Sequence, residues 1–325
     1  MFQHDSISFI YAAVIASFSI SFTYADHAEK SEFFEEITIV GNKDRASTVA
    51  GAAHFISDAE LEVFNYADIQ QILRQVPGVN LQLEDGYGLR PNIGIRGVQT
   101  ERSGRIMLLE DGVPIAPAPY AASSAYYFPT AGRMYSVEVL KGPAAITEGP
   151  NTIGGAINMI STPIPEETEG KVVAEVGGNS TTRVHAAYGS TNSDGFGYLI
   201  ETHQWKSDGF QSIDGSNSGT GLDIKDYTLK LGYAPIDSRH AFELKYQYAE
   251  QDSNQSYLGI TDTDFDRDPY RRYSVSQNDL MTTEHKQLIL RHDFSIRDNL
   301  NMTTTVYNND QARSWYKLDK LGGVG

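Results

Sequence analysis

The 325-residue sequence predicts a small α+β domain followed by the first strands of an antiparallel, all-β transmembrane barrel. Three observations support this fold class. Between Arg90 and Thr162, short apolar runs alternate with glycine-rich turns, as in a small, loop-rich sheet. After Pro163 the runs become longer and alternate between apolar and polar residues, with tyrosines near their ends. Past the N-terminal segment, no apolar run is long enough for a transmembrane helix.

Composition limits the possible functions. The chain has no cysteine, which excludes disulfides, cysteine zinc sites and thiol nucleophiles. Its formal net charge of -16 argues against nucleic acid as a partner, because phosphate binding needs lysine and arginine. The eight histidines are scattered, and no Gly-x-x-x-x-Gly-Lys motif is present. We therefore expect neither an enzyme nor a resident cofactor.

The first 25 residues are predicted to be a signal peptide. Ile7 to Phe22 are mostly apolar or small, and Thr23-Tyr24-Ala25 fits a small-x-small cleavage site. The lysine or arginine that usually precedes such a run is missing from residues 1–6. The alternative is a membrane anchor, although the serine-containing run is short for that role.

Residues 41–165 are predicted to form the α+β domain. Ser57-Asp58-Ala59-Glu60 is a capping box that begins a short helix. A second helix is expected over about Ala67 to Gln75, ended by Pro77-Gly78. Long irregular loops on a compact domain often carry function. Two such loops, rich in Gly, Pro, Tyr and Ser, are Gly86–Arg102 and Ala116–Tyr127.

Charged side chains lie next to apolar strand residues throughout this domain. They are Arg96, Glu110, Arg133, Glu138 and Lys141. One interpretation is the solvated face of a soluble domain. The other is a domain enclosed by the polar inner wall of a barrel, where such charges face partners instead of bulk water.

Four motifs carry the most information about this domain. In order they are Asn92-Ile93-Gly94-Ile95-Arg96-Gly97, Glu110-Asp111-Gly112-Val113-Pro114-Ile115, Val137-Glu138-Val139-Leu140-Lys141-Gly142-Pro143 and Gly154-Gly155-Ala156-Ile157-Asn158. Each motif alone is weak, because glycine turns between apolar runs occur in any β-rich domain. Their order and spacing closely resemble the plug domain of TonB-dependent outer-membrane receptors, from about Glu36 to Pro163. Such receptors import scarce nutrients, usually ferric chelates, into Gram-negative cells.

This resemblance implies several partners. Glu36-Ile37-Thr38-Ile39-Val40, within the predicted periplasmic segment 26–40, is similar to the TonB box. These receptors offer that box to TonB, which works with an inner-membrane energising complex. An extended, β-prone segment can add a strand to a partner's sheet edge, although the segment could instead be the first strand of the plug. In the family, the arginine of Ile-Arg-Gly and the glutamate of Val-Glu-Val help lock the plug to the barrel, which assigns Arg96 and Glu138 that role.

Residues 166–325 are predicted to be the N-terminal part of the barrel. Seven strand candidates are centred near Val173, Val184, Ile200, Leu229, Leu244, Leu290 and Thr304. Short connections alternate with the long ones at Ser207–Leu222 and Gln251–Thr283, which we expect outside the cell. Plugged transporters have about 22 strands, so the barrel is expected to be incomplete in this chain. Lipid and lipopolysaccharide of the outer membrane would surround it. A soluble sandwich gives the same alternation with the faces reversed in meaning.

Ligand-binding residues are expected on the outward loops. They are Gln99, Arg102 and Arg105, then Tyr120, and finally Tyr270, Arg271 and Arg272. Arginine suits an anionic chelate, and tyrosine supplies flat contact area. Gln99–Arg105 and Ala118–Tyr120 resemble segments of the ferric citrate receptor branch, which implies a ferric chelate as cargo and iron only as part of that ligand. The alternatives are cobalamin, a nickel chelate or an oligosaccharide on the same fold, or a soluble, secreted β-rich binding protein.

Overall fold

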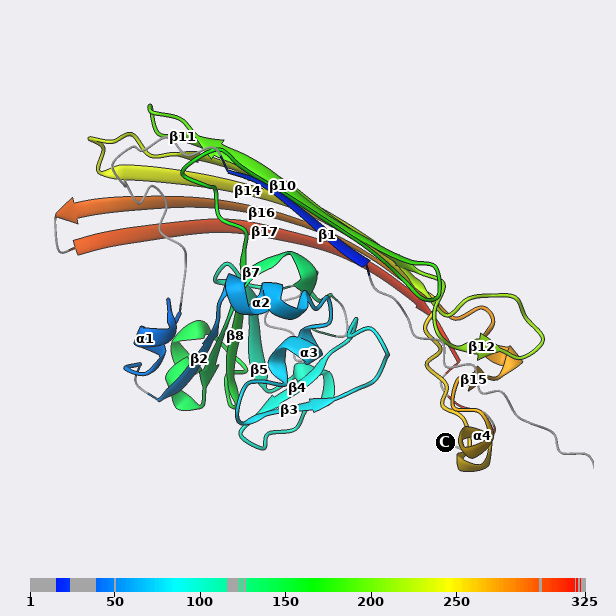
Figure 1. Ribbon diagram of the computed structural model, residues 1–325. Coiled ribbons are helices and arrows are strands. Elements are labelled where there is room, and N and C mark those ends of the chain that lie inside the picture. The colour runs from blue at the N-terminus through cyan, green and yellow to red at the C-terminus, as the bar shows by residue number, and fades with distance from the viewer. Residues whose placement is uncertain are drawn as a thin grey trace, which may run out of the picture.

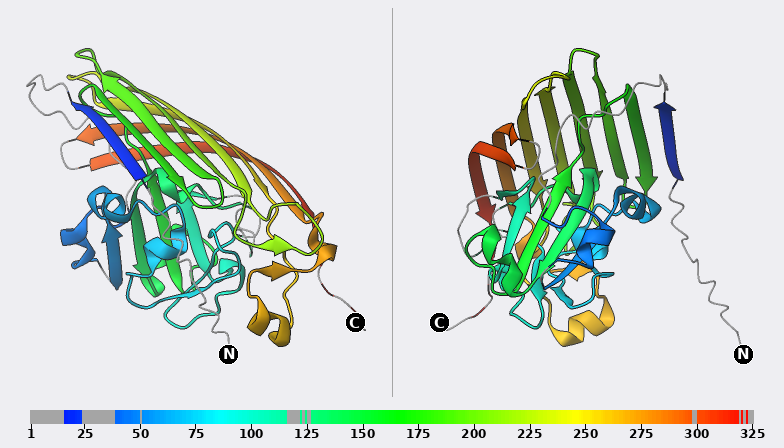
Figure 2. Two further views of the ribbon diagram at one scale, coloured as in Figure 1. Left: turned by 45° about the vertical axis from the view of Figure 1, so that its right-hand side comes forward. Right: turned by 90° about the vertical axis from the view of Figure 1, so that its left-hand side faces the viewer.

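The computed structural model describes residues 16–23, 39–49, 51–115, 122, 124, 127–297, 300–318, 320 and 322. It consists of a compact α+β domain and a curved sheet of long strands that arches over it (Figure 1). Views from two further directions show the domain against the concave face of the sheet (Figure 2). The predicted fold class, an α+β domain followed by antiparallel barrel-like strands, is confirmed.

The α+β domain is organised around a five-stranded sheet in the order β2-β7-β8-β5-β6. Its strands are β2 (Ala52–Ile56), β5 (Ile106–Glu110), β6 (Val113–Pro114), β7 (Met134–Lys141) and β8 (Gly155–Ser161). A separate pair joins β3 (Val79–Gln82) to β4 (Asn92–Ile95). Apolar residues of the sequence motifs, including Ile93, Ile95, Val137, Val139 and Ile157, are fully buried in one core. These runs form strands because strand pairing places their apolar side chains in the core.

Short helices complete this domain. They are α1 (Lys43–Ala46), α2 (Asp58–Phe64), α3 (Ile69–Leu73) and the 3₁₀ turns η1 (Glu101–Ser103), η3 (Ala131–Arg133) and η4 (Pro143–Glu148). The predicted capping box of α2 is present, with Ser57 N donating to Glu60 Oε2 at 3.1 Å. Helix α3 is shorter than predicted, because the Asp68 carboxylate caps it at Gln70 N (2.7 Å) and Pro77 disfavours helical backbone just before it.

The second body is an eight-stranded antiparallel sheet, here called the wall, in the order β1-β9-β10-β11-β13-β14-β16-β17. Its main strands are β9 (Glu169–Gly177), β10 (Thr181–Thr191), β11 (Phe196–Ser207), β13 (Leu222–Tyr233), β14 (His240–Ser253), β16 (Leu280–Arg297) and β17 (Leu300–Tyr316). Each of the seven predicted strand centres lies in one of these strands.

The eighth strand, β1 (Ala16–Thr23), pairs with the free edge of β9. The sequence analysis assigned this segment to a signal peptide and did not expect a strand. Its alternating Ser17-Phe18-Ser19-Ile20-Ser21-Phe22 has the period of two that suits an unpaired sheet edge. Cleavage before Asp26 stays a prediction.

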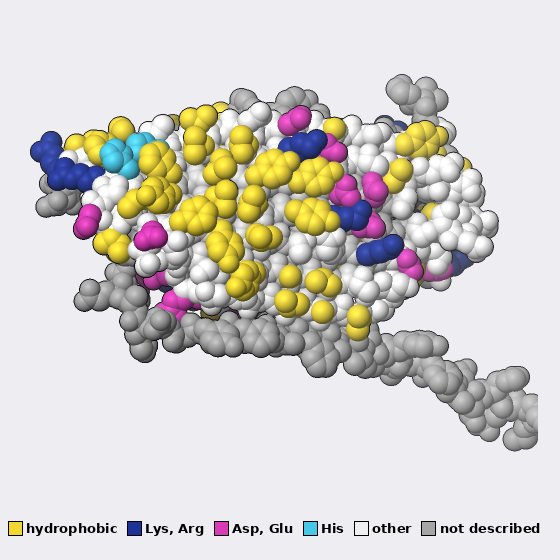
Figure 3. Space-filling view, turned by 90° about the horizontal axis from the view of Figure 1, so that it is seen from above, with side chains coloured by type: hydrophobic (Ala, Val, Ile, Leu, Met, Phe, Trp, Pro, Cys, Tyr) yellow, Lys and Arg dark blue, Asp and Glu magenta, His cyan; other side chains and the backbone are white. Residues whose placement is uncertain are grey.

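The two faces of the wall differ in polarity. On β14, Leu244 and Tyr246 are 36% and 43% exposed on the convex face, whereas Lys245 and Gln247 are 1% and 0% exposed beneath it. Figure 3 shows apolar side chains spread over the convex face. From Phe242 to Tyr248 this apolar band measures about 20 Å at about 3.4 Å per residue, close to the roughly 25 Å of outer-membrane barrels. Within the described residues, no helix combines the length and apolarity needed to cross a membrane.

The long connections gather at one end of the wall (Figure 1). They carry β12 (Ser212–Ile213), α4 (Asp262–Arg267), β15 (Arg271–Arg272) and η5 (Ser274–Ser276). Strands β12 and β15 pair in parallel and so join the two long loops. We call this the loop end. The turns before β11 and β14 lie at the opposite end, and the short turn between β9 and β10 lies at the loop end.

Candidate functional site

Five buried charges join the α+β domain to the wall. Arg133 Nη2 donates to Glu110 Oε1 and Arg133 Nε to Asp226 Oδ2, both at 2.8 Å. Lys245 Nζ lies 2.6 Å from both Glu110 Oε1 and Asp111 Oδ2. Glu110, Asp111 and Arg133 come from the domain, and Asp226 and Lys245 come from β13 and β14. We call these five residues the charged lock.

The local backbone places the acidic side of the lock. Asp111 and Gly112 turn the chain between β5 and β6 with φ values of +49° and +74°. The Asp111 carboxylate is held by Ser161, whose N and Oγ donate at 2.9 and 2.7 Å. Burial raises the pKa of Glu110, but Arg133 and Lys245 outweigh it and keep the pKa below its usual range. The pKa of Asp111 is likewise lowered against its burial, mainly by Lys245 and Lys230. Glu110 and Asp111 are therefore ionised carboxylates in a buried interface.

The two residues assigned to the contact between plug and barrel, Arg96 and Glu138, do not reach the part of the wall that the structure describes, and their role at the barrel stays a prediction. Glu138, expected at the wall, is fully buried inside the domain and accepts from Asn158 Nδ2 at 3.0 Å. Arg96 is exposed in a left-handed turn (φ +56°), and its guanidinium lies beside Gly142. Among the described residues, no hydrogen bond or ion pair links either side chain to the wall. The sequence analysis identified the charged residues that lie next to strands. It could not show which of these side chains lie at the edge of the domain that contacts β13 and β14.

Glu138 instead holds the end of the candidate TonB box. Its carboxylate accepts three backbone amides, from Ile39 (2.7 Å), Val40 (3.0 Å) and Gly41 (2.7 Å). Val40 is 1% exposed, so this short segment is fixed against the sheet. Glu36, Ile37 and Thr38 lie outside the described residues. We call the contact between Glu138 and residues 39–41 the box clamp.

A cluster of cations and aromatic rings lies at the loop end. The Arg90 and Arg313 guanidinium carbons lie 5.0 and 5.5 Å from the Trp315 ring centroid. Lys317 Nζ lies 3.3 Å from the Tyr257 ring centroid and 4.5 Å from that of Trp315. We call these five residues the cation–aromatic cluster. The sequence analysis missed this cluster, because Arg90 is more than 150 positions from its partners. The available indication of the cluster in the sequence was the tyrosine and tryptophan near strand ends.

Arg102, a predicted ligand residue, is near this cluster. Its Nη1 pairs with Glu84 Oε1 and Oε2 at 2.8 and 2.6 Å, and its backbone has φ +53°. Burial lowers the pKa of Arg102, but Glu84 outweighs it, with a smaller raising contribution from Tyr257 in the second long loop. Arg90 lies beside the same Glu84, at 3.8 Å. The domain thus presents two arginines and a carboxylate toward the loop end.

The other predicted ligand residues do not converge on one point. Gln99 is exposed and donates to Glu101 (2.8 Å), and Arg105 is exposed just before β5, at the opposite end of that strand from the charged lock. Tyr120 lies outside the described residues. Tyr270 is exposed at the loop end, where its ring meets Phe210 edge-on at 6.2 Å.

Two arginines of the second long loop have local partners. Arg271 pairs with Asp214 (2.8 Å) and Asp264 (2.7 Å), which ties the two long loops together. Arg272 Nη1 donates to the carbonyls of Pro269 and Arg271, and burial lowers the pKa of its guanidinium. Phe210 also lies 5.7 Å from Tyr87 of the domain. The long loops therefore contact the domain through aromatic rings. In the part of the chain that the structure describes, no three His, Asp or Glu side chains form a group able to hold a metal.

Comparison with known proteins agrees with this geometry. Residues 45–156 match the family model described as "TonB-dependent Receptor Plug Domain". The chain therefore carries a plug domain of the TonB-dependent receptor family. Its α+β domain is the plug, the wall is part of the barrel, and the protein belongs to the outer membrane of a Gram-negative cell. This location replaces the alternative of a soluble, secreted binding protein.

Curated relatives are similar to this chain in sequence, and solved structures are similar to it in fold. The chain is 28% identical over 218 residues to "Vitamin B12 transporter BtuB" of Vibrio vulnificus (strain CMCP6), covering 66% of this chain and 33% of that protein. It is similar in fold to the unliganded ferric citrate transporter FecA, with a TM-score of 0.73, 23% identity and coverage of 86% and 42% of the two chains. The fold is also similar to that of the ferric yersiniabactin uptake receptor FyuA of Yersinia pestis. The TM-score is 0.68 at 20% identity, and the match covers 83% of this chain and 42% of that chain. The receptor chain thus spans about a third of the curated relative it matches.

Proposed function

We propose that this TonB-dependent receptor imports a ferric chelate, with the plug as gate and TonB as the source of energy. The cation–aromatic cluster carries the proposal. Three cations and two aromatic rings meet there, next to Arg102, at the end of the wall with the long loops. Arginines and lysines suit carboxylate or catecholate groups, and indole and phenol rings suit the flat faces of a chelate.

The box clamp and the charged lock fit the same activity. A partner that adds to residues 36–40 by strand pairing must compete with Glu138 for backbone amides at Ile39 and Val40. The lock joins the plug to two wall strands through ionised groups, so pulling the plug must break buried ion pairs. TonB is the proposed source of this pull.

Cobalamin is the second candidate cargo. The observation that favours it is the 28% identity to proteins named as vitamin B12 transporters. Cyanocobalamin carries no net charge, however, and has less use for a group of cations. Equilibrium binding to receptor-containing outer-membrane vesicles separates the two candidates. We expect saturable binding of ferric citrate that cyanocobalamin does not displace. Saturable cyanocobalamin binding without ferric citrate binding would favour the second candidate.

Arg102→Ala is expected to weaken ferric citrate binding about tenfold. A charge-assisted hydrogen bond contributes about 1.5–3 kcal/mol, and the ligand must first draw Arg102 from Glu84. Glu84→Gln should therefore tighten binding, because it removes a competing carboxylate. Arg267→Ala, on the exposed helix α4, is the control and should leave the affinity unchanged. Equal affinities of the Arg102→Ala and native receptors would move the ligand away from Arg102, with Arg271 and Arg272 tested next.

A further inference from the structure

A histidine of the wall lies close to the point where the chain passes from the plug into the wall. His185 on β10 has its Nε2 atom 2.8 Å from Oε1 of Glu201 on β11. The same Glu201 oxygen accepts a hydrogen bond from Thr162 Oγ1, directly after β8 of the plug, at 2.6 Å. The Glu201 side chain is 0% exposed, and its other oxygen has no hydrogen-bond partner among the described residues. His185 and Thr162 therefore share one buried carboxylate that joins the two bodies.

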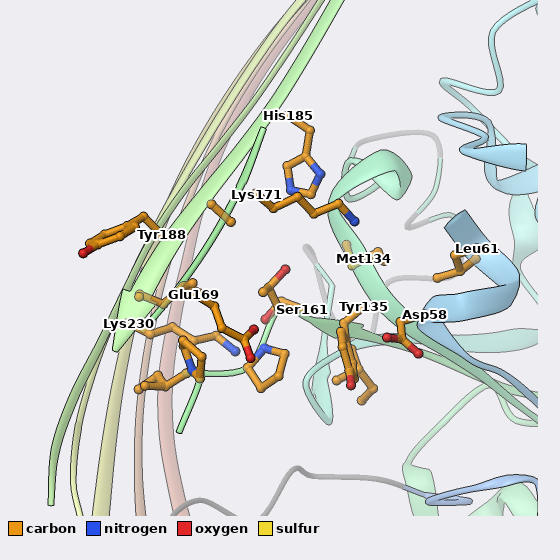
Figure 4. Close-up of a pocket in the computed structure, with 18 of the residues that line it drawn as sticks. Asp58, Leu61, Met134, Tyr135, Ser161, Glu169, Lys171, His185, Tyr188 and Lys230 are labelled. Carbon is orange, nitrogen blue, oxygen red and sulfur yellow. The ribbon is translucent and has the colours of Figure 1, made fainter. Parts of the chain in front are cut away.

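Protons can reach His185 from solvent. Its side chain is 12% exposed and lines a cavity of about 580 Å³ between the plug and the wall. Figure 4 shows the His185 ring on the plug side of the wall. A cavity of this size has room for several water molecules, since each occupies about 30 Å³ in the liquid. Histidine is also the side chain whose charge ordinarily changes between about pH 5 and about pH 8. His185 can therefore gain and lose a proton while the plug is in place.

The buried charges between the plug and the wall leave room for one more positive charge. Among the described side chains at this contact that are no more than 12% exposed, five are carboxylates and four are cations. The carboxylates are Glu110, Asp111, Glu201, Asp226 and Glu243, and the cations are Arg133, Lys230, Lys245 and Arg291. Of the more exposed residues that line the cavity, Lys171 pairs with Glu62, whereas Asp58, Glu166 and Glu169 add further negative charge. An imidazolium at His185 would supply the fifth positive charge beside a buried carboxylate.

The other charged and titratable groups around His185 do not supply this charge. They are Lys171 on β9, Arg183 on β10, His203 on β11 and Arg133 of the plug. Lys171 and Arg183 pair with Glu62 and Glu175, and Arg133 is held by Glu110 and Asp226. The ring centroid of His203 lies 5.9 Å from that of His185, but His203 is 1% exposed, and burial without a partner opposes a charge there.

We propose that His185, Glu201 and Thr162 form a proton-dependent latch that helps hold the plug at the wall. With its proton, His185 forms an ion pair with Glu201 and neutralises the carboxylate that Thr162 contacts. Without it, the neutral ring can still donate from Nε2, but the buried carboxylate keeps an unmatched charge. Displacing the plug exposes Glu201 to water, where the ion pair contributes little. The latch concerns the attachment of the plug and applies to any cargo.

The sign of the pH dependence follows from this difference between the two states. The attached plug favours the protonated form of His185, so the contribution of the latch is complete in acid and is lost as the pH rises toward about pH 8. His54 of β2 has the opposite sign. Burial, with a smaller contribution from Lys141, lowers the pKa of His54, so its contribution to plug stability is lost as the pH falls.

The urea midpoint for plug unfolding, measured at about pH 5.5 and about pH 8, tests the latch across the range in which histidine titrates. Detergent-solubilised receptor is equilibrated at each pH and then receives a brief pulse of proteinase K at a common pH. The native midpoint should be about 0.5–1 M higher in acid. His185→Gln should lose this rise and stay near the native alkaline midpoint, because glutamine donates a hydrogen bond without a charge. His185→Arg, which is always charged, should also lose the rise but stay near the native acid midpoint.

His54→Gln is the matched control, because it replaces a plug histidine of opposite sign. It should keep the rise in acid, since the latch is intact. Equal midpoints at the two pH values in the His54→Gln receptor would overturn the latch. A rise in His185→Gln as large as the native one would assign the proton to another group and would overturn it as well.

Discussion

Lys245→Met is expected to weaken the attachment of the plug to the wall by about 3–5 kcal/mol. The substitution removes an ammonium that lies 2.6 Å from two carboxylates and leaves Glu110 and Asp111 short of positive charge in a buried interface. Methionine matches the length of the lysine stem, so the loss of the charge dominates the effect. A change of this size should lower the urea midpoint for plug unfolding by more than about 1 M, at about 1–3 kcal/mol per M.

The measurement is trypsin cleavage of the plug in detergent-solubilised receptor across a urea series. Lys225→Met is the control, because Lys225 lies on the neighbouring strand with the same residue type but faces outward and pairs with Glu250 in solvent. Its midpoint should stay close to native. If Lys245→Met and Lys225→Met shift the midpoint equally, the charged lock does not hold the plug.

Ile37→Pro is expected to abolish energised uptake while ferric citrate binding stays native. Proline removes a backbone donor that strand addition to TonB requires. The three amides that Glu138 accepts belong to Ile39, Val40 and Gly41, so Ile37→Pro replaces none of them. Ile39→Pro should also abolish uptake, but it disturbs both contacts, because Ile39 N donates to Glu138. Normal uptake in both variants would show that the segment is only a plug strand.

Glu138→Gln separates the clamp from the box. It replaces charge-assisted hydrogen bonds with weaker neutral ones, at a loss of about 1 kcal/mol each. Residues 39–41 should then leave the sheet more often, and a larger fraction of receptors should offer the box. The affinity of the isolated TonB C-terminal domain for the unliganded receptor should rise about tenfold. Ser57→Ala, which removes the side-chain hydrogen bond to Glu60 at the start of α2 and none of the three amides, is the comparison for general damage to the plug. An unchanged affinity for TonB in Glu138→Gln would show that the clamp does not restrain the box.

Much of the fold could be predicted because the alternation of apolar and polar residues that marks a strand is visible within its own short segment of sequence. Alternation such as Phe242, Leu244, Tyr246 and Tyr248 fixes both the strand and the face that meets lipid. The first of the two predicted helices was found by its capping box and the second by its Pro77-Gly78 end, but the Asp68 cap begins the second helix later than predicted. The strand β1 was assigned by its overall apolarity as a signal peptide, although its alternation also fits a sheet edge.

The sites were less predictable because they depend on three-dimensional proximity. Glu110 and Glu138 both follow apolar strand residues, yet one reaches Lys245 and the other reaches the backbone of Ile39. Only the direction of β5 and β7 relative to the wall distinguishes them. The cation–aromatic cluster joins Arg90 to Trp315, and no local pattern connects positions so far apart. The assignment of Arg102 to the ligand stays a prediction.

Accumulation of radiolabelled iron, supplied as ferric citrate to iron-starved cells that carry the receptor, tests the central claim most directly. The measurement compares otherwise identical cells with and without TonB. The account predicts saturable accumulation that requires both the receptor and TonB, with surface binding unchanged when TonB is absent. Equal accumulation with and without TonB would contradict an energy-coupled importer of this chelate.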